Sequence, residues 1–397
     1  MKKISISIIC SAFVILGFAQ NKLSKSDIAT IDYKVVAMKK EQIAKQDQDL
    51  MEAYNNLLKT CDKNMSFGPF SVMDKKDLPP SGNKHDYMSL APYWWPDPNT
   101  KTGLPYIRKD GEVNPEVSNY PDKESMPKVC EKVYEFGLAF YLSGNEKYAK
   151  KAKELVRTWF LDSATKMNPN VNYGQAVKGV VEGRAEGLID TRQFIFLLDG
   201  VHLLNKSKSW TINDNNELKN WFKAYYDWLD NSKIGIDEKK AANNHGIWYD
   251  AQALAITNFL ENNEESKKII NRALVRLKDQ MDAKGAFPLE LGRTNSLHYS
   301  VFILNAFECI AQLSENINVD FRNTKLSNGM SLKNAYDFII PFLLEDKAWT
   351  WPELNHFNIG DAYPLLLSAT KHYDCKTCIP LMKTKSPDYS KMVIKLL

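Results

Sequence analysis

Large apolar residues recur at helical spacing over almost the whole chain, and this periodicity limits the fold more than any other feature. The stripes Leu50 to Cys61, Tyr148 to Trp159 and Leu218 to Leu229 each place their apolar side chains on one helix face. The same pattern predicts helices near 127–143, 188–205, 246–260, 264–281, 297–314, 332–345 and 361–372. No comparable segment alternates with the period of two that a half-buried strand requires. The sequence therefore predicts an all-α protein.

These helices follow one another in pairs without a break in composition, which favours stacked helical hairpins. We expect an α/α toroid, an incomplete barrel of helical hairpins, built by a single domain over residues 20–397. Residues 66–126 are the exception, because this stretch is rich in Pro, Gly, Asp and aromatic residues and has no helical period. Long loops in compact proteins are usually functional. We expect this aromatic-rich loop to form a cleft wall or lid.

Residues 1–19 have the layout of a secretory signal peptide. Lys2 and Lys3 precede a short apolar run, and small residues end it before Gln20. A lipid anchor at Cys10 is the alternative, although small residues do not precede that cysteine. The expected localisation is exported, periplasmic or secreted, without stable membrane insertion, because no second apolar run is long enough to span a bilayer.

Charge and cysteine content argue against a nucleic-acid partner and a zinc site. The chain has 52 basic and 48 acidic residues, and removal of Lys2 and Lys3 leaves a net charge near neutrality, which does not suit nucleic-acid binding. Cys375 and Cys378 can form a local disulfide or remain two thiols, and a zinc site there would lack ligands beyond His372. We expect no metal and no cofactor. The oligomeric state stays open, with a monomer as the expectation.

Asn243-Asn244-His245-Gly246 stands directly before an apolar helix. One asparagine can cap that helix, which places His245 in its first turn. Both asparagines can equally be simple turn residues beside a histidine with no catalytic role.

A second polar motif runs from Arg293 to Tyr299 and also precedes a helix. Asn295 or Ser296 is the expected cap, so Tyr299 lies near the helix start. Unpaired N–H groups at two such starts would favour an anionic ligand. The alternative for Tyr299 alone is a core aromatic with a hydrogen-bonded hydroxyl.

The aromatic-rich loop contains Tyr93, Trp94 and Trp95 within a Tyr87 to Pro98 segment. Aromatic side chains in a segment without helical period offer flat faces with polar edges, which suits stacking against sugar rings. Either tryptophan taken alone can instead fill the seam between loop and barrel.

Together the Tyr87 to Pro98 segment, Asn114-Pro115-Glu116, Asn244-His245 and the Arg293 to Tyr299 motif resemble the alginate lyase superfamily with an α/α toroid fold, over roughly residues 60–370. Within it the chain looks closest to polysaccharide lyase family 38, which acts on mannuronate-rich alginate or glucuronan. The interval from arginine to tyrosine is one residue shorter here than in family 5 lyases, so Thr294 or Asn295 can also take part.

The resemblance implies β-elimination of a 4-linked acidic polysaccharide. It assigns Asn244 and Arg293 to the substrate carboxylate, Tyr299 to the catalytic phenol and His245 to proton handling. In β-mannuronate the C5 proton and the C4 oxygen share a face, so Tyr299 can serve as both base and acid; guluronate would need His245 as base. Further candidate contacts to substrate are Tyr93, Trp94, Trp95, Arg184, Arg192, His298, Trp351 and His356, for which packing or ion-pair roles are equally open.

Two other functions remain as alternatives besides glucuronan cleavage. An inverting glycoside hydrolase on a toroid would need two carboxylates, for which Asp86, Glu182 and Asp190 are the candidates. A non-catalytic polyuronate-binding protein would use the aromatic loop but would leave the Arg293 and Tyr299 motif without a purpose.

Overall fold

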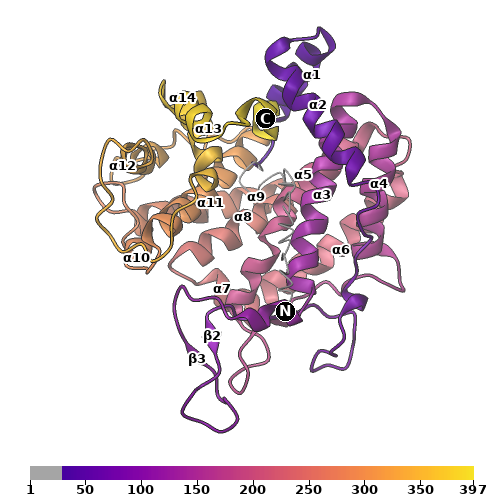
Figure 1. Cartoon of the computed structure of the whole chain (residues 1–397), viewed down its shortest axis with the longest axis vertical. Helices are drawn as coiled ribbons and strands as arrows, with labels where there is room; N and C mark the ends of the chain where they lie inside the picture. The colour runs from indigo at the N-terminus through magenta and orange to yellow at the C-terminus, as the bar shows by residue number, and fades with distance from the viewer. Residues whose placement is uncertain (1–28) are drawn as a thin grey trace, which may run out of the picture.

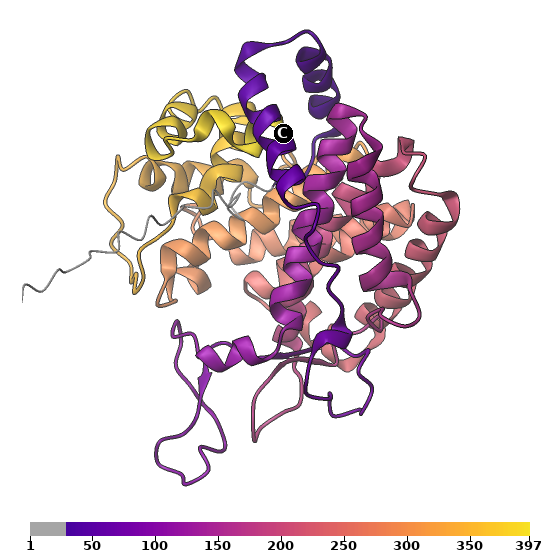
Figure 2. The same ribbon diagram turned by 45° about the vertical axis from the view of Figure 1, so that its right-hand side comes forward.

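The computed structural model describes residues 29–397, so the predicted signal peptide over residues 1–19 lies outside the described residues. Figures 1 and 2 show a helical assembly with a hairpin-like loop extending from one end. Within the described part, the helices are α1 (Tyr33–Ala44), α2 (Gln48–Lys63), α3 (Asp122–Ser143), α4 (Glu146–Val156), α5 (Phe194–Leu203), α6 (Ile212–Asn231), α7 (Lys233–Lys239), α8 (Asn244–Phe259), α9 (Asn263–Gln280), α10 (Pro288–Leu291), α11 (Ser296–Asn316), α12 (Leu332–Leu343), α13 (Tyr363–His372) and α14 (Cys378–Lys385).

Four helices with mostly buried residues form the inner layer. α3, α5, α8 and α11 pack against one another in chain order, and most of their residues are buried. A helix that is apolar on every side belongs in the interior, whereas an amphipathic helix covers it. α4 and α9 are of the second kind, with one buried face each, and they pack on α3 and α8. This two-layered arrangement confirms the predicted all-α toroid of helical hairpins.

One hydrophobic cluster of buried residues extends from Ile31 to Leu397 and joins nearly all of these helices. Buried polar contacts also stabilise this core. Arg322 pairs with Glu308 on α11 at 2.7 Å, and Tyr336 on α12 donates to the same carboxylate. Among residues 29–397, no helix has the length and apolar character needed to cross a membrane.

The aromatic-rich loop is more regular than the sequence predicts. β1 (Met88–Leu90) pairs in parallel with β4 (Tyr173–Ala176), and β2 (Trp94–Trp95) pairs antiparallel with β3 (Ile107–Arg108). α3 begins at Asp122, so the end of the segment expected as loop is already helical. These strands are too short for their periodicity to be read from the sequence. The extension that carries β2 and β3 projects beyond the helices in both views (Figures 1 and 2).

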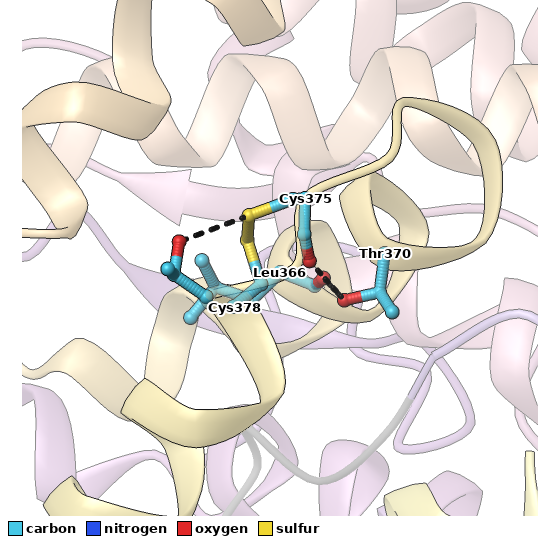
Figure 3. Close-up of a disulfide and its surroundings, with 5 residues drawn as sticks. Leu366, Thr370, Cys375 and Cys378 are labelled. Atoms are coloured by element: carbon cyan, nitrogen blue, oxygen red, sulfur yellow. Dashed lines mark hydrogen bonds between the residues drawn. A yellow bond between two sulfur atoms is a disulfide. The ribbon is translucent and has the colours of Figure 1, made fainter.

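Cys375 and Cys378 form a disulfide between α13 and α14, which is one of the two states expected from their spacing. Figure 3 shows the disulfide beside Thr370, whose hydroxyl donates to the carbonyl oxygens of Leu366 and Cys375. The bridge therefore ties the start of α14 to the segment that follows α13.

α3 and α5 approach each other closely where Gly137 faces Gly200. A Cβ atom at position 200 would lie 2.6 Å from the Cα atom of Tyr134 and 2.7 Å from the carbonyl oxygen of Val133. Both are backbone atoms of a packed helix, so they cannot move aside as the end of a side chain would. The inner layer therefore depends on glycine at this crossing.

Gly200→Ala should lower the free energy of unfolding by about 1–3 kcal/mol or more, because the added methyl group overpacks the crossing. Denaturant unfolding followed by circular dichroism measures this change. Gly292→Ala is the matched control, since its nearest atom would be 3.7 Å away. Equal stability of the two variants would show that the crossing is not tightly packed.

Candidate active site

A cleft of about 770 Å³ enters the helical assembly, and one face of α11 lines it. His298, Tyr299, Phe302, Asn305 and Gln312 on α11 all border the cleft at helical spacing. The start of α8, the segment before α5, the aromatic-rich loop and α13 supply most of the other walls. The structure thus brings Asn244, His245, Arg293 and Tyr299, which come from separate parts of the sequence, into one cleft.

The start of α8 has the cap that the sequence predicts. The side chain of Asn243 accepts a hydrogen bond from the backbone N–H of His245 at 3.1 Å. His245 Nδ1 lies 2.6 Å from Oε1 of Glu238, a carboxylate that is 2% exposed. Burial raises the pKa of Glu238, and His245 opposes that rise. This contact fixes the orientation of the imidazole ring and leaves Nε2 for a ligand.

Asn244 is held by a second buried carboxylate, that of Glu290 on α10. Glu290 accepts from the Asn244 backbone N–H at 2.8 Å, and both of its oxygens lie within 3.0 Å of Asn244 Nδ2. Burial raises the pKa of Glu290, and the bonds from Asn244 oppose this effect. The amide carries two hydrogens, and Glu290 requires only one of them, so the other can reach a ligand.

The prediction that two helix starts offer unpaired N–H groups to an anion is wrong. Glu290 already occupies the start of α8. At the start of α11, Asn295 makes no capping bond with its side chain; the backbone N–H of Leu297 instead donates to Glu353 at 2.7 Å. Other N–H groups at these starts donate to the side chain of Asn243 and to the backbone oxygen of Pro352. Protein acceptors therefore satisfy these groups, because buried N–H groups need an acceptor even without substrate. Side chains must supply most of the positive charge for an anionic substrate.

Arg293 lies over the ring of Tyr299, with its guanidinium carbon 3.7 Å from the centroid of the phenol ring. Asp110, from the aromatic-rich loop, accepts from Arg293 Nε at 3.2 Å and from Nη2 at 2.9 Å. The hydroxyl of Thr294 donates to the same carboxylate at 3.2 Å. The loop thereby fixes the guanidinium and leaves Nη1 as the donor for a ligand.

The Tyr299 hydroxyl is 3.1 Å from the hydroxyl of Tyr93. Burial raises the pKa of Tyr299, the neighbouring Tyr93 adds to the rise, and the charge of Arg293 opposes it. The phenol is therefore protonated at neutral pH in the unliganded protein. Arg293 is the neighbouring cation that favours the phenolate.

Five of the eight other predicted contact residues line the cleft. They are Tyr93, Trp94, Arg184, Arg192 and His298. Trp94 and Trp95 are consecutive strand residues, so their side chains point to opposite faces and only Trp94 borders the cleft. The indole of Trp95 donates to the carbonyl oxygen of Glu112 and lies under the Lys109 ammonium group.

Trp351 and His356 do not border the cleft either. Trp351 packs in an aromatic cluster with Phe338, Phe342 and Trp349, and its ring centroid is 4.8 Å from that of Trp349. His356 is exposed on the segment that follows.

Three carboxylates that hold the site were not predicted in that role: Asp110, Glu238 and Glu290. Glu290 is three residues from Arg293 and Glu238 is seven residues from His245, so proximity in the sequence was a weak signal. The pairing of Glu290 with Asn244 and of Glu238 with His245 depends on how α10 and α7 pack beside α8. Sequence spacing does not report that packing.

The family model described as alginate lyase matches residues 71–349. A crystal structure of an alginate lyase from Bacteroides ovatus is 33% identical, with a TM-score of 0.85, and the match covers 91% of this chain and 96% of that chain. A search of curated protein sequences gives no match.

More distant structures share the fold. Alginate lyase A1-III from Sphingomonas species A1 is 14% identical, with a TM-score of 0.51 and coverage of 81% of this chain and 88% of that chain. A histidine-to-alanine variant of alginate lyase A1-III, complexed with a tetrasaccharide, has the same identity and TM-score and covers 89% and 92%. The family model and the 33% identical structure together show that this chain belongs to the alginate lyase family and is a polysaccharide lyase.

Proposed function

We propose that this protein cleaves 4-linked polyuronate, preferentially polymannuronate, by β-elimination with Tyr299 as base and acid. The observation that carries the proposal is the stacking of Arg293 on Tyr299, in the same cleft as Asn244 and His245. A phenol and a fixed cation beside a carboxylate-binding amide suit removal of a proton next to a carboxylate. The alginate lyases named above support the substrate class.

Charge neutralisation is the first requirement of this reaction. The C5 proton of a uronate is weakly acidic, because the neighbouring carboxylate is already negative. Arg293 Nη1 and the second Asn244 hydrogen would bind that carboxylate and the charge that moves into it. A preorganised donor of this kind typically contributes about 2.7–4 kcal/mol to lowering the barrier.

The proton steps then fall to Tyr299. The phenol first loses its proton to solvent, which the charge of Arg293 favours. The phenolate then takes the C5 proton, the electrons of that bond form the C4–C5 double bond, and the C4–O bond breaks. The same phenol returns the proton to the departing glycosidic oxygen. No other acid or base is needed in mannuronate, because C5–H and C4–O lie on one face of the ring.

His245 is better suited to support than to the main proton transfer. Its Nδ1 is bound to Glu238, so the ring has a fixed orientation. In guluronate, where the two groups lie on opposite faces, His245 Nε2 would have to act as base. This is the physical reason for proposing the preference for mannuronate.

The inverting glycoside hydrolase is a weaker explanation of the site. Asp86 accepts from Ser81 and Asn168 and does not border the cleft. Asp190 does border it, but Tyr87, Ser89 and Gln175 donate to its two oxygens. A general acid and a general base need carboxylates that are free to exchange protons with substrate and water.

We also propose that the protein is exported, with residues 1–19 as its signal peptide. The support from the described residues is the disulfide between Cys375 and Cys378, since such bonds persist in oxidising compartments.

Purified protein incubated with polymannuronate should produce ultraviolet absorbance together with new reducing ends, because elimination creates a conjugated double bond. Polyguluronate and glucuronan should react at least several-fold more slowly. Initial rates from absorbance and from a reducing-sugar assay measure both quantities. Reducing ends without absorbance would show hydrolysis, and a faster rate on guluronate or glucuronan would overturn the proposed preference.

Arg293→Gln should lower kcat/KM on the order of a hundredfold or more, because a preorganised charge donor is lost. It should also move the ascending limb of the pH profile to higher pH. Arg293 opposes the rise in the pKa of Tyr299, so its removal raises that pKa further and the phenolate forms only at higher pH. Arg293→Lys, which keeps the charge, is the control and should show the smaller pH shift.

Asp110→Asn should shift the same ascending limb to lower pH. The charge of Asp110 contributes to raising the pKa of Tyr299, so an uncharged residue there lowers that pKa. The rate above the limb should still fall, since Arg293 loses its ion pair with this carboxylate. Asp97→Asn, in the same loop but bonded only to its own turn, is the control. An unchanged pH profile in Asp110→Asn would exclude this electrostatic coupling.

A further inference from the structure

The cleft continues past Tyr299 along α11, and the next turns of this helix form its wall. Phe302 and Asn305 follow Tyr299 at intervals of three residues and border the same cleft. Each interval advances roughly 4.5 Å along the helix axis. A sugar ring has a similar length. A polymer held at Tyr299 therefore has room for an adjoining sugar beside Phe302.

Arg192 differs from the other arginines of the cleft in lacking a carboxylate partner. Arg293 and Arg108 pair with Asp110, and Arg184 pairs with Glu186. Among the described residues, Arg192 forms no such ion pair; its Nη1 donates to the backbone oxygen of Ile189 at 3.0 Å.

The charge of Arg192 is therefore only partly compensated. Burial lowers the pKa of Arg192, and Asp190 opposes this effect. The Asp190 oxygens, however, already accept bonds from Tyr87, Ser89 and Gln175. A guanidinium has five N–H donors. Arg192 therefore has donors left for an anion in the cleft.

Phe302 links Arg192 to the rest of this wall. The Arg192 guanidinium carbon lies 5.4 Å from the centroid of the Phe302 ring. The indole of Trp248 is 5.1 Å from the same ring, and the imidazole of His298 is stacked on it at 6.0 Å. An apolar ring surface with a cation at its edge matches the mixed character of a uronate, which has an apolar ring face and a charged carboxylate.

Trp248 adds a hydrogen-bond donor to this wall, and Asn305 adds an acceptor. Trp248 is 4% exposed and borders the cleft, yet its indole N–H has no hydrogen-bond partner among the described residues. Buried donors without an acceptor are rare in proteins, so this group indicates a ligand or a water molecule. The Asn305 amide donates to the backbone oxygen of Asp361, which leaves its own oxygen as an acceptor for a hydroxyl group.

We propose that Arg192, Phe302, Trp248 and Asn305 form a subsite for the uronate that adjoins the sugar at Tyr299. Arg192 binds the carboxylate of that neighbouring sugar and makes the subsite selective for acidic over neutral sugars. The subsite rests on the proposed function, because it assumes that the polymer is cleaved beside Tyr299. Arg192 is a specificity-determining residue and does not contact the reacting atoms.

Steady-state kinetics on mannuronate oligosaccharides of increasing length test this role. Arg192→Gln should raise KM on the order of tenfold to a hundredfold for the lengths that fill the subsite, as expected for loss of a charge-assisted bond. The value of kcat should change much less. Arg157→Gln is the control, since Arg157 pairs with Asp214 and does not border the cleft. An unchanged KM at every length would overturn the subsite.

Binding in an inactivated background separates this proposal from the proposed function. Calorimetry with Tyr299→Phe protein should show that Arg192→Gln weakens binding of hexamannuronate but not of its carboxyl-reduced counterpart. Arg192→Lys should retain part of the difference and serves if Arg192→Gln fails to fold. Equal losses for both ligands would contradict carboxylate recognition, even if the wild-type protein is an active lyase. If no unsaturated product ever forms, the proposed function fails while this binding result still decides the subsite.

Discussion

The ion pair between Arg293 and Asp110 joins two parts of the chain that are 183 residues apart, and the geometry of the site depends on it. Arg293 belongs to the segment before α11, and Asp110 belongs to the loop that follows β3. Their bidentate contact holds the guanidinium against the Tyr299 ring and brings Tyr93 to the phenol hydroxyl. The aromatic-rich loop is therefore part of the active site as well as its wall.

Carboxylates behind the site explain why its polar groups are ready before substrate binds. Asp110, Glu238 and Glu290 each bond to one of the residues assigned to the reaction. Such fixed dipoles and charges need little reorganisation when charge develops on a substrate. The same acids limit the positive charge of the cleft, because they neutralise part of it. Arg192 is the exception among the cleft arginines, which is why its role in selecting acidic sugars is a separate question from catalysis.

The helical architecture could be predicted because its information is local. A stripe of apolar residues such as that of α2 or α9 follows the helical period directly. α1 buries only Val36 and Ile43, and α7 and α10 are short, so none of them leaves a readable pattern. A disulfide could be considered from the sequence for the same reason, since its cysteines are three residues apart.

The candidate residues were found from local motifs, but their partners were not. Asn244, His245, Arg293 and Tyr299 stand beside helix starts, and those starts can be recognised from the sequence. That Glu353 caps α11 and Glu290 bonds to Asn244 depends on tertiary packing. Packing in an aromatic cluster also keeps Trp351 out of the cleft, and Trp95 faces away because it alternates with Trp94 on a strand too short to recognise from the sequence.

The central claim is that Tyr299 carries the proton in both directions while His245 supports it. The most direct measurement compares Tyr299→Phe and His245→Gln on polymannuronate, following ultraviolet absorbance after circular dichroism has shown that both variants are folded. Tyr299→Phe should lose activity by a factor on the order of 10² to 10⁴, as expected for loss of an acid and base, and His245→Gln should lose less. A folded Tyr299→Phe variant with activity close to that of the wild-type protein would contradict the account.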